Sequence, residues 1–148
     1  MTLGQVMLPT DANPRGNVHG GAIVKLVDEA AAMAATKHSR LSVVTVVLDS
    51  VTFLSPVYVG DLLTLAAEVT WAGTSSMEVE VHVEAENVRS GERTHTNSAT
   101  AVYVALDDHG KPCPVPPLAP ETNEERERMA EAEARQEARL ARRAKHRT

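Results

Sequence analysis

The sequence predicts an α+β domain in which one long buried helix packs against a curled antiparallel sheet. Residues 22–37 place apolar side chains at helical spacing. Four runs rich in β-branched residues follow, at 42–53, 61–72, 75–88 and 92–106, and short connections join the last three. One helix and one sheet must share a core, and the sheet can enclose the helix only by curling around it.

Length, cysteine content and hydropathy limit the class of protein. A chain of 148 residues fits one domain of ordinary size. Its single cysteine, Cys113, provides neither an internal disulfide nor a zinc finger. No stretch approaches the roughly 18 apolar residues of a membrane span, and the N-terminus lacks a signal-peptide pattern. We therefore expect a cytoplasmic protein without membrane insertion.

The distribution of charge argues against a nucleic-acid partner. Residues 1–120 carry thirteen acidic and seven basic side chains, whereas residues 121–148 carry seven acidic and eight basic ones. Nucleic acid requires a clustered basic face, which an acidic body does not provide. With only four aromatic side chains in the chain, we also expect no stacking platform for single-stranded nucleic acid.

The N-terminal third divides into a strand, an irregular segment and the helix. Residues 2–8 fit a short strand, and residues 9–21 are dense in proline, glycine, asparagine and aspartate, which favour turns. The helix from Ala22 to about Lys37 has mostly alanines in its second half. Small side chains of this kind let a covering sheet approach the helix axis closely, so we expect this helix to be buried.

The later runs predict a meander with one wet face. From Met77 to Ala85, apolar residues alternate with Glu78, Glu80, His82 and Glu84, which is the period-two pattern of a half-buried strand. The connections 72–74 and 89–91 have hairpin length. The connection 54–61 is longer and is expected to pass across the helix.

The C-terminal region predicts a separate helical extension. A proline-rich spacer at 112–120 ends the domain, giving boundaries of 1–118 for the domain and 119–148 for the extension. Thr122 or Asn123 can cap a helix from about Glu124 to Lys145, acidic at its start and basic at its end. Since its apolar residues are nearly all alanines, we interpret it as solvated or frayed, with subunit packing as the alternative.

The start of the long helix is the most informative candidate site. Gly20 and Gly21 allow a ligand to approach the backbone, and the first N–H groups of a helix are free to donate. Such donors can stabilise the oxyanion formed when a carbonyl is attacked. An ordinary glycine-rich helix start is the structural alternative.

Asp28 and Glu29 are the candidate catalytic carboxylates. Helical geometry allows at most one of them to share the buried face of Ile23 and Val27. A carboxylate on a buried helix is costly unless it is paired or used in chemistry. Lys25, three residues before Asp28, offers a purely structural partner.

Other reactive residues give weaker patterns. The six histidines show no metal-site spacing, and no serine lies in a GxSxG context, so neither a metal nor a serine triad is expected. Cys113 has only Lys111 as a basic neighbour and is interpreted as a bystander.

Three sequence motifs stand out when they are taken together. The segments LPTDANPRGNVHGGAIVKLVDEAAAMAATKH and VTFLSPVYVGD contain N-x-H-G-G-x-x-x-x-x-x-D and F-L-x-P-V-x-x-G-D, and residues 97–104 carry the weaker N-x-A-T-x-x-Y-V. These motifs resemble the cytosolic acyl-CoA thioester hydrolase family of hotdog-fold proteins. The likeness covers residues 7–117 and leaves the C-terminal helix outside. It implies a hotdog fold, in which the sheet wraps the central helix, and acyl-CoA thioesterase activity.

The resemblance also implies roles for individual residues. Asp28 would act as general base or nucleophile, and an asparagine from the partner subunit's loop would orient water or substrate. We assign this role to Asn13 and assign Asn17 to shaping the turn. Gly20 and Gly21, with Asn17 and His19 beside them, would bind and polarise the thioester carbonyl.

The implied assembly is a homodimer that extends to a trimer of dimers, a hexamer, with active sites between subunits. No cofactor is expected, because coenzyme A is part of the substrate and a product. Thr74, Ser75, Ser76 and Arg93 are the candidate contacts for coenzyme A. Two alternatives stay open: an acyl-CoA sensor that leaves the thioester intact, and a hotdog dehydratase, for which His19 is the only histidine near the helix.

Overall fold

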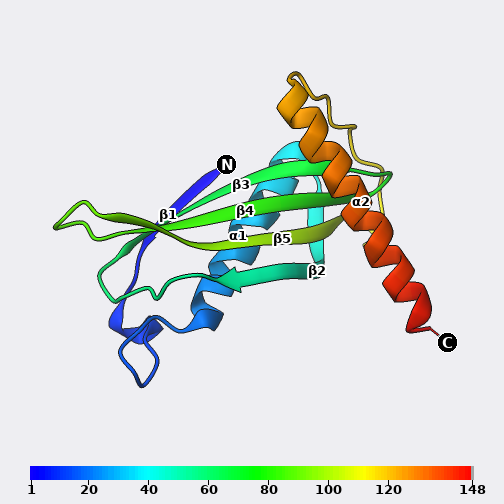
Figure 1. The fold of residues 1–148 in the computed structure, drawn as a ribbon. Coiled ribbons are helices and arrows are strands. Elements are labelled where there is room, and N and C mark those ends of the chain that lie inside the picture. Colours follow the sequence, from blue (N-terminus) through cyan, green and yellow to red (C-terminus); the bar gives the residue numbers. More distant parts are fainter. Residues whose placement is uncertain (148) are drawn as a thin grey trace.

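The computed structural model describes residues 1–147 and has the predicted α+β architecture (Figure 1). Thr148, the last residue of the expected 119–148 extension, lies outside the described residues. Neither helix of residues 1–147 is long and apolar enough to span a membrane. The elements in chain order are β1 (Thr2–Val6), a 3-10 turn (Pro9–Asp11), α1 (Gly20–Ser39), β2 (Ser42–Phe53), β3 (Leu62–Ala72), β4 (Ser76–Glu86), β5 (Arg93–Leu106) and α2 (Asn123–Lys145).

The five strands form one antiparallel sheet in the order β1-β3-β4-β5-β2. The predicted meander of β3, β4 and β5 is confirmed. These strands are consecutive in sequence and adjacent in the sheet, so short turns are enough to join them. β2 pairs with β5 at one edge, and two strands, β5 and β4, separate it from β3. The 54–61 connection therefore carries the chain back across the sheet, which explains its length.

The core lies between α1 and the inner face of the sheet. Ala30, Ala31, Ala34 and Ala35 are all buried on the face of α1 that meets the strands. Their small side chains allow the close approach that the sequence indicated. Opposite them, the inward residues of β4 (Met77, Val79, Val81, Val83 and Ala85) are buried, as the alternation predicted.

The outer face of the sheet is covered in part by α2, and here two sequence-based expectations were wrong. The helix is not solvated along its whole length: it crosses the sheet (Figure 1), and Ala132 of α2 is fully buried. Glu78, expected on the wet face of β4, is also fully buried. Arg135 and Arg139 of α2 contact its two carboxylate oxygens at 2.6 and 2.7 Å.

Further ion pairs connect α2 to other strands. Arg128 contacts Glu68 of β3 at 2.8 Å, and Arg139 contacts Asp49 of β2 at 3.0 Å. Burial by itself raises the pKa of the Glu78 carboxyl, but hydrogen bonds from the two arginines and from Thr70 outweigh it, and the pKa lies below its ordinary value. Glu78 is therefore charged at neutral pH and serves as an attachment point for α2.

Candidate active site

The loop before α1 is built around the side chain of Asn13. Its Oδ1 accepts hydrogen bonds from the backbone N–H groups of Arg15 (2.9 Å) and Asn17 (3.2 Å). Gly16 completes the turn with a φ of 86°, in the left-handed region that favours glycine. The turn-shaping role that we assigned to Asn17 therefore belongs to the carboxamide oxygen of Asn13, and Asn17 contributes backbone groups.

The first turn of α1 is capped by His19. Its Nδ1 accepts a hydrogen bond from the N–H of Gly21 at 2.9 Å, so this nitrogen carries the lone pair and Nε2 carries the proton. The amide of Gly21, which we expected to polarise a carbonyl, is occupied in this way. Within residues 1–147 no acceptor faces the N–H of Gly20, which makes Gly20 the better candidate donor of the two.

Both glycines are closely packed against aromatic rings. A Cβ at Gly20 would lie 3.3 Å from the ring of Phe53, the last residue of β2. A Cβ at Gly21 would lie 3.1 Å from the imidazole of His19. A side chain at either position would displace an aromatic ring at the helix start, so the Gly-Gly pair has a packing reason as well as a possible chemical one.

The carboxylate of Asp28 points from the middle of α1 toward β2 and β5, whereas Glu29 is exposed. Oδ1 of Asp28 accepts a hydrogen bond from the hydroxyl of Thr45 on β2 at 2.8 Å and from the hydroxyl of Tyr103 on β5 at 2.7 Å. These two hydroxyls, rather than the expected Lys25, are its partners. Asp28 is partly buried, so a ligand at the β2 edge can reach it.

Neither hydroxyl donor was identified from the sequence. Thr45 lies in the apolar run of β2, where an inward threonine has no distinguishing pattern. Tyr103 belongs to the motif at 97–104, and this motif was the only sequence feature that could have drawn attention to it. The tyrosine is fully buried, and burial together with its hydrogen bond to Asp28 raises the pKa of its phenol far above the ordinary value.

The start of α1 and Asp28 are too far apart to act on one carbonyl within a single chain. Eight residues separate Gly20 from Asp28, and a helix rises about 1.5 Å per residue, so the separation along the axis is roughly 12 Å. Each chain therefore carries two partial sites, one at the helix start and one at Asp28.

The residues proposed to contact coenzyme A lie at opposite ends of the sheet. Thr74, Ser75 and Ser76 are at the β3–β4 turn, whereas Arg93 begins β5 opposite Glu86, with which it pairs at 3.8 Å. The backbone carbonyls of Thr74 and Ser75 accept hydrogen bonds from Val115 and Ala105. These four residues do not form one site in a single chain, and their contact with coenzyme A stays a prediction.

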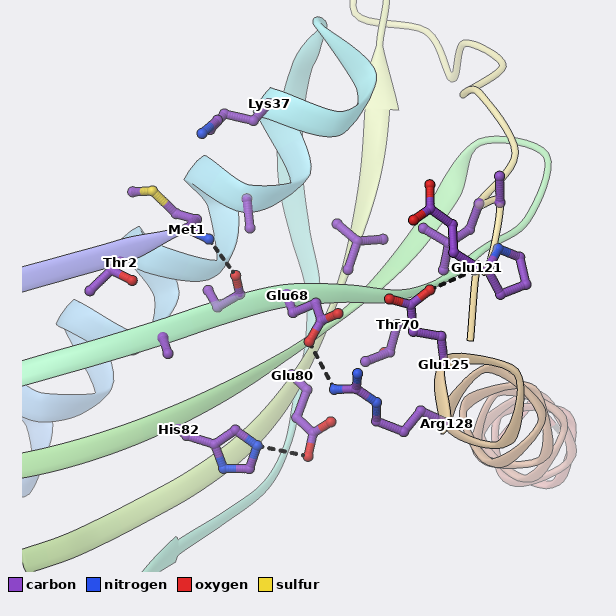
Figure 2. Close-up of a pocket in the computed structure, with 17 residues that line it drawn as sticks. Met1, Thr2, Lys37, Glu68, Thr70, Glu80, His82, Glu121, Glu125 and Arg128 are labelled. Atoms are coloured by element: carbon purple, nitrogen blue, oxygen red, sulfur yellow. Dashed lines mark hydrogen bonds and ion pairs between the residues drawn. The ribbon is translucent and has the colours of Figure 1, made fainter. Parts of the chain in front are cut away.

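A surface cavity of about 620 Å³ lies elsewhere, beside β3 (Figure 2). Met1, Lys37, Glu80, His82 and Arg128 are among the residues around it. It adjoins the β1 edge of the sheet, where that strand begins, opposite the β2 edge to which Asp28 points. We therefore place the candidate chemistry at Asp28 and not at this cavity. Within residues 1–147 no cluster of three or more His, Cys, Asp or Glu side chains is arranged to hold a metal ion.

A central helix enclosed by a curled antiparallel sheet defines the hotdog class, and comparison with known proteins places the chain within it. The model of the Thioesterase superfamily matches residues 15–92. The chain belongs to the thioesterase superfamily.

Relatives of known sequence include an uncharacterized acyl-CoA thioester hydrolase of Bacillus subtilis, YkhA. It is 43% identical over 80% of this chain and 69% of its own length. The cytosolic acyl coenzyme A thioester hydrolase of Rattus norvegicus is 39% identical over 86% of this chain. The match spans only 34% of the rat protein, so this chain corresponds to about a third of that relative.

Solved structures resemble the whole described fold, including α2. A hexameric acyl-CoA thioesterase without ligand is 43% identical, with a TM-score of 0.91 over 97% of this chain and 92% of that one. An acyl-CoA hydrolase from Staphylococcus aureus, in complex with butyryl coenzyme A and coenzyme A, is 38% identical, with a TM-score of 0.89 over 99% of this chain and 90% of that one.

Proposed function

We propose that this protein hydrolyses acyl-CoA thioesters to a free fatty acid and coenzyme A. The observation that carries the proposal is the Asp28 carboxylate, held on the central helix by two hydroxyl donors and reachable from the β2 edge. The relatives named acyl-CoA thioester hydrolases support the same activity. The name of the rat relative also favours a cytosolic location.

The spacing of three residues supports the same site. Alanine variants of the Staphylococcus aureus hydrolase have been solved at an asparagine, an aspartate and a threonine. In that protein the asparagine precedes the aspartate by 15 residues and the threonine follows it by 17. Asn13 and Thr45 stand at these same intervals from Asp28. We therefore propose that Asn13, Asp28 and Thr45 act together.

The proposed site combines parts of two chains, because one chain holds its helix start and its Asp28 about 12 Å apart. Asn13 and the helix start, with Gly20 as the leading donor, come from one subunit, and Asp28 comes from its partner. β2 supports such an assembly, since it is an edge strand with exposed Val44, Val46 and Leu48. The hexameric relatives favour further assembly into a trimer of dimers.

The proposed reaction needs only groups that the two chains supply. The amide of Gly20 polarises the thioester carbonyl, and Asn13 orients the attacking water. In one route, Asp28 takes a proton from that water while the oxygen of the water bonds to the carbonyl carbon. In the other, Asp28 attacks the carbonyl carbon directly and forms an anhydride, which water then hydrolyses. The carbon–sulfur bond breaks, and coenzyme A leaves as a thiolate.

The proposal is tested by following thiol release from CoA thioesters of several chain lengths. We expect turnover by the native protein and a loss of at least about a hundredfold in Asp28→Ala and Asp28→Asn, the scale of removing a positioned acid or base. Glu29→Gln, at the exposed neighbouring position, serves as the control and should retain activity. Binding without thiol release by the native protein would instead indicate an acyl-CoA sensor.

A further inference from the structure

Tyr103 of β5 contacts Asp28 from the side of α1 that faces the sheet. Its side chain rises from the inner face of β5 and is fully buried, yet its hydroxyl reaches two oxygens of the same residue. It lies 2.7 Å from Oδ1 of Asp28 and 3.0 Å from the backbone carbonyl oxygen of Asp28. Contact with both oxygens fixes the carboxylate relative to its own backbone.

The phenol has one proton to donate, and the carboxylate is the better acceptor. A charged acceptor at shorter distance forms the stronger hydrogen bond. Burial and the hydrogen bond to Asp28 raise the pKa of Tyr103 far above its ordinary value, so the phenol keeps its proton and donates at neutral pH.

Thr45 donates to the same oxygen. It lies directly opposite Tyr103 in the β2–β5 register, next to an irregularity at Val46 that is typical of a β-bulge. Both hydroxyls converge on Oδ1, at 2.8 and 2.7 Å. Within residues 1–147 no hydrogen-bond donor contacts Oδ2. The two oxygens of Asp28 are thus in different surroundings.

We propose that Tyr103 is a positioning residue which, together with Thr45, occupies Oδ1 of Asp28 and leaves Oδ2 as the oxygen that reacts. This inference rests on the proposed thioesterase function. Oδ2 takes the proton from water, or bonds to the carbonyl carbon, whereas Oδ1 stays fixed by its two donors. The carboxylate is held in place before substrate arrives, so little reorganisation accompanies the reaction.

The test is Tyr103→Phe, which removes the hydroxyl and keeps the ring. With Asp28 less fixed, kcat should fall about tenfold, whereas KM should change less than about threefold. Thr45→Val should lower kcat in the same way, and Thr45→Ser, which retains the hydroxyl, should keep the native kcat.

The matched control removes the hydroxyl of Thr100, which lies on the outer face of β5. Thr100→Val removes contacts with Asp49 and Arg139 on the outer side of β5, so it should lower stability and leave kcat unchanged. A Tyr103→Phe protein with native kcat would overturn this inference while Asp28→Ala remained inactive. Native activity in Asp28→Ala would instead overturn the proposed function itself.

Discussion

Asn13 uses one atom of its side chain for structure and leaves another available. Its Oδ1 accepts two backbone hydrogen bonds and shapes the turn before α1. Within residues 1–147 its Nδ2 group has no hydrogen-bond acceptor. A role in turn shape and a role in catalysis therefore rest on different atoms and can be separated by substitution.

Asn13→Asp retains the acceptor oxygen and removes the amide donor. We expect the variant to keep the turn, with a thermal midpoint close to that of the native protein, and to lose at least about tenfold in kcat. Asn13→Ala should lose both activity and stability, because it also removes the turn acceptor. Thiol-release kinetics and thermal unfolding measure the two effects. Full activity in Asn13→Asp would restrict Asn13 to turn shape.

The sequence could indicate single residues of the site but not their neighbours in space. Asp28 and the glycines were identified because glycine pairs and a carboxylate on an apolar helix are unusual in a local pattern. Thr45 and Tyr103 lie 17 and 75 residues from Asp28 along the chain, so only the sheet register brings them together. Local patterns carry no information about such contacts.

Among the elements, α2 shows most clearly what alternation and composition cannot predict. The limits of the strands and helices followed from period and turn residues to within about two positions, as is usual for strongly periodic segments. The position of α2 on the sheet could not be predicted in this way, because α2 is attached through arginines rather than through an apolar face. Arg135 and Arg139, one helical turn apart, approach a glutamate that the alternation placed in water.

Removal of the Glu78 charge should weaken this attachment. Glu78→Gln leaves Arg135 and Arg139 without their buried partner, and breaking a buried ion pair on one side costs about 3 kcal/mol or more in the free energy of unfolding. Urea unfolding at neutral pH measures the loss. Glu84→Gln, on the same face of β4, should change the free energy of unfolding little, and an equal loss in both variants would contradict the assigned role.

The ion pairs of Glu78 with Arg135 and Arg139 also predict how stability depends on pH. The pKa of Glu78 is lower in the folded protein than the ordinary value of 4.5, so its contribution is present above that value and is lost as the pH falls through the folded pKa. Below about pH 4.5, urea unfolding should show that the free energy of unfolding falls less with decreasing pH in Glu78→Gln than in the native protein.

For the whole molecule, the proposed unit of activity is larger than the chain. Each chain presents a helix start and an Asp28 that are too far apart to act together, and β2 leaves one sheet edge unpaired. A closed twofold dimer would bring each partial site against its complement from the partner. Two identical sites would then form for every pair of chains.

Mixing two inactive variants tests this arrangement. Chains with Asn13→Asp and chains with Asp28→Asn, refolded together in equal amounts, form mixed dimers with one intact site. Random pairing should restore about a quarter of the native activity, because half of the dimers are mixed and each has one working site of two. Thiol release before and after refolding measures the recovery. Absence of recovery in a mixture shown to contain mixed dimers would place the whole site within one chain.

The strand order also determines when the site is completed as the chain folds. Thr45 follows Asp28 by 17 residues, but Tyr103 follows it by 75, after the β3–β4–β5 meander. β2 remains unpaired until β5 exists, and closing so long a loop slows folding. Asp28 can therefore acquire its second hydroxyl donor only when the sheet closes, so that the positioned carboxylate and a finished core arise in the same folding step.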